Sequence, residues 1–129
     1  MNPLSQTLII AGGVYHLCFV AFHLCFWKLF AWKQDLRRTQ PVNRGIMQVM
    51  NLCLIFIFLA TAYLSFLWQA ELLLSGLGHA LLLLIAAFWL LRAIEQAIFF
   101  DSRKPLSLLL MLIFLIGSAL YLMPGYFLM

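Results

Sequence analysis

The sequence predicts an all-α integral membrane protein, a four-helix bundle that forms a single transmembrane domain over residues 1–129. The first observation is composition: 66% of the residues are apolar and 9% are charged, whereas a soluble domain is about 45–50% apolar and about 25% charged. The second is that apolar runs long enough to cross a bilayer, about 20 residues each, occur four times. A soluble chain of this length could not bury so much apolar surface.

Each predicted helix has its own signal. The first apolar run follows a segment without Lys or Arg and exceeds the roughly 7–15 residues of a signal-peptide core, so we expect it to stay attached. Pro105 suits the first turn of the fourth helix, and Pro124-Gly125 ends it. We expect the four helices at about residues 4–30, 43–68, 78–100 and 106–123.

The basic residues predict the orientation. The third loop carries Arg103 and Lys104, and the second loop carries no Lys or Arg. The first loop carries Lys28, Lys33, Arg37, Arg38 and Arg44. Because Lys and Arg collect on the cytoplasmic side, loops one and three are expected there and both termini outside. The membrane is expected to be the inner (plasma) membrane of a bacterium. This topology explains the net charge of +4. A nucleic-acid partner would need a basic surface outside the membrane, and no segment is long enough to form one.

Polar residues inside the predicted spans mark the candidate site, because such residues usually face the bundle interior. His16 and His23 are seven residues apart and share a face of the first helix with Gly12 and Gly13. His23 is expected near the cytoplasmic side, level with polar residues of the second and third helices. The candidate ligand-binding residues are His16, His23, Asn43, Gln48, Asn51, Arg92 and Glu95, with Gln96 beside them. The alternative is that they only hydrogen-bond helices together.

The sequence predicts neither a cofactor nor a metal. A haem held by two histidines needs them on different helices at one depth, but His16 and His23 share a helix, and His79 lies roughly 10 Å nearer the outer surface. The three cysteines lack C-x-x-C spacing, and there is no His-x-x-x-His pair.

Two short patterns resemble a known family. The run HLCFVAFHLCFW from His16 to Trp27, and the segment Asn43-Arg44-Gly45-Ile46-Met47-Gln48, resemble small uncharacterised four-helix bacterial membrane proteins grouped loosely with the DoxX-like proteins. That family has an acidic residue where His23 stands and a second Asn where Gln48 stands. The resemblance covers about half the chain. It implies the same helix count and again indicates His16, His23, Asn43 and Gln48, but it implies no reaction.

The function predicted from these observations is a binding or accessory protein with a polar intramembrane pocket near the cytoplasmic side, for a lipid or hydrophobic small molecule. One alternative is an intramembrane enzyme acting on a quinone, an isoprenoid or a sterol-like molecule, with His23 as acid or base and Glu95 as its partner. The other is a structural subunit of a larger complex, whose partner would be a membrane protein.

Overall fold

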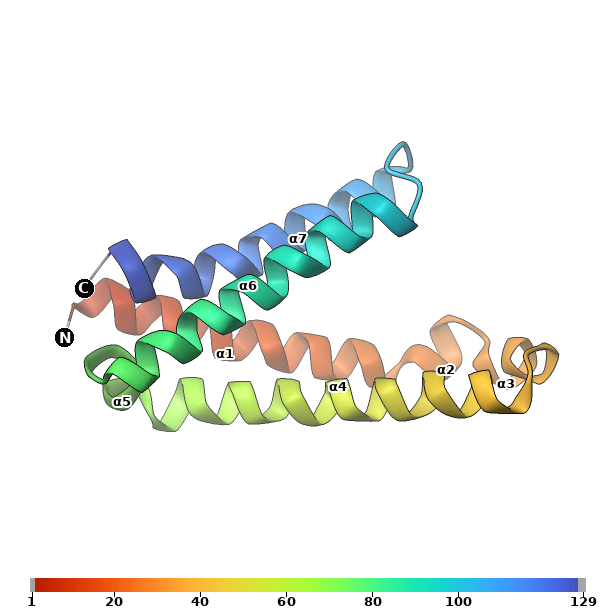
Figure 1. Ribbon diagram of the computed structural model, residues 1–129, viewed down its shortest axis with the longest axis horizontal. Helices are drawn as coiled ribbons and strands as arrows, with labels where there is room; N and C mark the ends of the chain where they lie inside the picture. The colour runs from red at the N-terminus through yellow and green to blue at the C-terminus, as the bar shows by residue number, and fades with distance from the viewer. Residues whose placement is uncertain (1, 128–129) are drawn as a thin grey trace.

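Four long helices make up most of the computed structural model, which describes residues 2–127 (Figure 1). Each is long and apolar enough to cross a membrane, and the described residues contain no strand. The four are α1 (Pro3–Leu24), α4 (Pro41–Leu67), α6 (Gly76–Phe99) and α7 (Pro105–Leu122). The predicted all-α, four-helix integral membrane protein is therefore confirmed.

Short elements connect the long helices. The continuous helix expected over residues 4–30 is instead divided at Cys25, whose N–H is shared between the carbonyls of Ala21 and Phe22. Ala31 then adopts the left-handed conformation (φ 49°), directly before Trp32. The connecting elements are α2 (Phe26–Leu29), α3 (Trp32–Asp35), η1 (Leu36–Arg38) and α5 (Gln69–Leu74). A further short element, η2 (Met123–Phe127), follows α7 at the end of the described chain.

Local sequence signals set where the long helices begin. The Asn2 side chain accepts a hydrogen bond from the Leu4 N–H (3.0 Å), and Ser75 does the same for the Gly78 N–H (2.9 Å). These caps satisfy N–H groups that have no partner inside the helix. α4 and α7 begin with Pro41 and Pro105, where a missing N–H is tolerated.

The long helices form two hairpins, α1 with α4 and α6 with α7 (Figure 1). The hairpins meet where α1 packs against α7 and η2, and where α5 packs against α6. We call this the closed end. The described chain begins and ends there. Toward loop one (residues 25–40) and loop three (residues 100–104) the hairpins separate, and we call this the diverging end (Figure 1).

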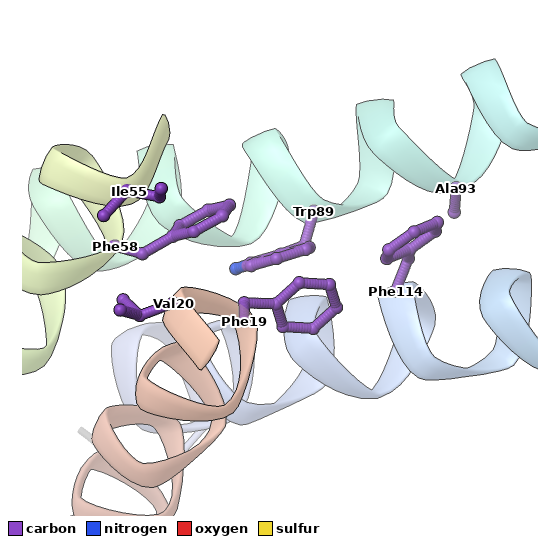
Figure 2. Packing of buried hydrophobic residues seen from close by; sticks show 7 residues of the cluster. All are labelled: Phe19, Val20, Ile55, Phe58, Trp89, Ala93 and Phe114. Atoms are coloured by element: carbon purple, nitrogen blue, oxygen red, sulfur yellow. The ribbon is translucent and has the colours of Figure 1, made fainter. Parts of the chain in front are cut away.

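An aromatic cluster lies where the hairpins separate, with a member from each long helix (Figure 2). The Trp89 indole is 1% exposed and stacks between Phe58, at 5.5 Å between ring centroids, and Phe114, at 5.8 Å. Phe19 packs on the same indole at 4.7 Å. Each ring adds a large apolar area to the contact, so this cluster holds the hairpins together at mid-length.

The helix faces that do not contact another helix are apolar. Phe56, Leu84 and Leu109 are each more than half exposed within the chain. At most 39% of any span is buried inside the molecule. This pattern is expected for helices whose solvent is lipid.

Candidate functional site

Glycines bring α1 close enough to its neighbours to form a polar centre. A Cβ added to Gly12 would lie 2.6 Å from the Tyr121 ring, and one added to Gly13 would lie 2.8 Å from the Phe66 ring. No other residue fits these positions without movement of the neighbouring ring. The predicted inward orientation of the face with Gly12, Gly13 and His16 is confirmed.

His16 lies at the middle of a buried hydrogen-bond chain. Its Nε2 is 3.2 Å from the Trp89 indole nitrogen. Its Nδ1 lies 2.8 Å from the Gly12 carbonyl and 3.1 Å from the Tyr121 hydroxyl. Tyr121 is in turn 2.8 Å from the Ser65 hydroxyl. The chain thus joins α1, α4, α6 and α7, and all four side chains are at most 1% exposed.

Donor and acceptor roles in this chain follow from chemistry. An indole N–H can only donate, so Trp89 donates to His16 Nε2, and the proton of the neutral imidazole is assigned to Nδ1. Nδ1–H then donates to Gly12 and to the Tyr121 oxygen, and the Tyr121 hydroxyl donates to Ser65. Both ring nitrogens of His16 are occupied. The geometry gives His16 a role in joining helices rather than in holding a ligand.

His23 and Asn51 form a second polar group, on the hairpin of α1 and α4. The Asn51 amide donates to the His23 carbonyl (3.2 Å), which lies at the end of α1. His23 Nδ1 is 2.9 Å from the Phe19 carbonyl, and its ring stacks on Phe26 at 4.4 Å between centroids. Asn51 is 3% exposed, and its Oδ1 is buried without a hydrogen-bond partner among residues 2–127.

Arg92 belongs to the opposite hairpin. Its guanidinium donates to Gln96 Oε1 (3.1 Å), and Gln96 donates to the Ser107 hydroxyl of α7 (3.0 Å). The Arg92 charge lies 4.6 Å from the centre of the Phe114 ring, a favourable cation–π arrangement. It also interacts electrostatically with Glu95 and with His23. Within the described chain, no carboxylate forms an ion pair with it.

The single polar cluster expected from the sequence is therefore divided between the hairpins. His23 and Asn51 lie on one hairpin, and Arg92 and Gln96 on the other, because the hairpins separate at this level. Glu95 is half-buried and interacts electrostatically with Arg92. Three predicted residues lie elsewhere: Asn43 is exposed in the first turn of α4, Gln48 lines a pocket at loop one, and His16 belongs to the buried chain.

Apolar grooves flank the junction of the hairpins. A groove of about 490 Å³ between α1 and α7 is lined by Tyr15, Phe22 and Leu110, among others. A smaller one of about 170 Å³ between α4 and α6 is lined by Phe58, Phe88 and other apolar side chains, with His16 at its inner side. Both have the character of sites for hydrocarbon.

Comparison with protein-family models, with curated proteins and with solved structures finds no match to this chain. The resemblance to DoxX-like proteins stays a prediction. Function is therefore inferred from the geometry of the chain itself.

Proposed function

We propose that this protein binds a lipid or hydrophobic small molecule between its two hairpins, at their diverging end, in the cytoplasmic leaflet of a bacterial inner membrane. The observation that carries the proposal is the Oδ1 of Asn51, which is buried and has no hydrogen-bond partner in residues 2–127. An unsatisfied buried acceptor costs about 1–3 kcal/mol. A ligand that displaces the side chains covering Oδ1 and donates a hydrogen bond to it would remove that cost.

The polar groups around this position define the chemistry of the ligand. Asn51 Oδ1 accepts hydrogen bonds, and so does His23 Nε2 when Nδ1–H donates to Phe19. Arg92, on the opposite hairpin, only donates hydrogen bonds. A matching molecule has a polar end that both donates and accepts hydrogen bonds, such as a hydroxyl or carboxyl group. The apolar grooves supply surface for its hydrocarbon part.

The surroundings of His23 favour binding over acid–base catalysis. A histidine base is usually oriented by a carboxylate on its second nitrogen. Here the second nitrogen bonds to the Phe19 carbonyl, and in the described residues no carboxylate contacts the ring. Glu95, the partner expected for an enzyme, interacts with Arg92 instead.

The test is native mass spectrometry of the full chain extracted from its own membranes. We expect one lipid-soluble molecule per chain in the wild type and in Asn43→Leu, a matched control at an exposed position of the same helix. Asn51→Leu should reduce its retention about tenfold, which corresponds to about 1.4 kcal/mol. Because Asn51 also caps α1, Arg92→Gln provides a second variant with the same expected loss. Equal retention in all four proteins, or no retained molecule in any, would contradict the proposal.

A further inference from the structure

A second candidate site lies at loop one, apart from the polar groups between the hairpins. A pocket of about 450 Å³ opens between loop one and the first turns of α4. It lies in the size range of small-molecule sites, about 300–1,000 Å³. Its charged lining consists of Lys28, Lys33, Arg37 and Arg44. We call it the loop-one pocket.

No negative charge offsets these four cations. The pocket lining contains no Asp or Glu, and Asp35, the one acid in loop one, is exposed elsewhere. In residues 2–127 none of the four basic side chains forms an ion pair. The Arg44 Nη2 group makes a 3.5 Å contact with the Thr39 carbonyl, while its Nε is buried and has no hydrogen-bond partner in the described chain. The pocket therefore carries four positive charges without a paired carboxylate and a buried donor that lacks an acceptor.

Other parts of the lining fit the boundary between lipid and water. The rings of Trp27 and Trp32 pack edge to face, 5.1 Å apart, and tryptophan favours the headgroup level of a membrane. α4 begins beside the pocket with neither a side-chain cap nor an acidic residue in its first turn. The positive end of its dipole adds to the potential of the four side chains.

The positive-inside rule alone does not explain this arrangement. The rule requires basic residues on one side of the membrane, but it does not require them to surround one cavity. Arg38 satisfies the rule equally well, and it lies in the same loop without lining the pocket.

We propose that the loop-one pocket binds a phosphate monoester, with Arg44 and Arg37 contacting the phosphate oxygens and the two lysines supplying further charge. Guanidinium groups suit phosphate because they donate two parallel hydrogen bonds. Basic pockets at the cytoplasmic ends of transmembrane helices bind the headgroups of anionic lipids. This site is separate from the one between the hairpins and does not depend on it.

The test uses the full chain reconstituted in vesicles of equal parts phosphatidylcholine and phosphatidic acid, followed by native mass spectrometry of the bound lipid. We expect the wild type to carry phosphatidic acid in preference to phosphatidylcholine. Arg37→Gln and Arg44→Gln should each lower that preference about fivefold, since one basic side chain contributes about 1 kcal/mol at such a surface. Arg38→Gln, which removes the same charge from the same loop, should leave it unchanged.

Added inorganic phosphate identifies the source of the phosphate group. Displacement of phosphatidic acid by phosphate supports a soluble phosphate ester as the ligand, and persistence of the lipid supports a lipid headgroup. Asn51→Leu should not change the preference, so this test can fail while the site between the hairpins stands. A wild type without preference, or an Arg38→Gln variant as impaired as Arg37→Gln, would overturn the proposal.

Discussion

At the scale of single residues, His16 shows how a polar side chain is accommodated in a membrane. Each of its ring nitrogens has a partner, so no hydrogen-bonding capacity faces lipid. Trp89 and Tyr121 are 73 and 105 residues away in sequence. The spacing of His16 from Gly12 and His23 predicts its inward face. It could not predict these partners, because they depend on the helix arrangement.

The hydroxyl of Tyr121 is expected to contribute measurably to stability. Tyr121→Phe removes the group that joins His16 to Ser65 and leaves the Ser65 hydroxyl without its partner. We expect a loss of about 1–2 kcal/mol, seen as a lower midpoint of thermal unfolding by circular dichroism in detergent. Tyr63→Phe is the matched control, because Tyr63 lies 54% exposed on the outer face of α4. Equal midpoints for the two variants would show that the buried chain does not stabilise the fold.

At the scale of helices and loops, sequence prediction succeeds where apolar character changes and fails where it does not. Residues 101–104 are polar, and α6 ends at Phe99, just before them and within one residue of the expected position. The break at Cys25 lies inside a run that stays apolar through Phe26 and Trp27, so composition gives no sign of it. The loop-one pocket depends on that break and on the left-handed Ala31. Its basic residues are therefore evident in the sequence, but their arrangement around one cavity is not.

The turn between α5 and α6 provides a test at this scale. A Cβ on Gly78 would collide with the backbone of α5, lying 2.5 Å from Leu72 Cα and closer still to the Glu71 carbonyl oxygen. Backbone cannot move aside as a flexible side chain can, so Gly78→Ala should displace α5 and lower the unfolding midpoint and the monodisperse yield. Gly76→Ala is the control, because a Cβ there meets nothing within 4 Å. Similar behaviour of the two variants would contradict the described packing of α5.

At the scale of the whole molecule, the number and character of the helices could be predicted, but the angle between the hairpins could not. An apolar run predicts that a segment crosses the membrane. It does not predict which helices pair most closely. The predicted cluster requires four helices that stay close together along their whole length, so that His23, Asn51, Arg92 and Glu95 would meet. The aromatic cluster around Trp89 fills the junction instead, and beyond it the polar groups lie on separate hairpins.

The separation of the hairpins toward loops one and three is the condition on which the proposed site between them depends. It is tested most directly by electron–electron distance measurements between spin labels in lipid nanodiscs, after Cys18, Cys25 and Cys53 are replaced. One pair, Val42 with Ile98, reports the distance from α4 to α6 at the diverging end. The other, Leu67 with Leu77, reports it at the closed end, and all four positions are well exposed.

We expect a clearly longer distance for Val42–Ile98 than for Leu67–Leu77, because α4 and α6 lie close together at the closed end and move apart beyond the aromatic cluster toward loops one and three (Figure 1). Equal distances for the two pairs would indicate a bundle whose four helices stay close together from one end to the other. In such a bundle the hairpins would be closed along their whole length, and the proposed site between them would not exist.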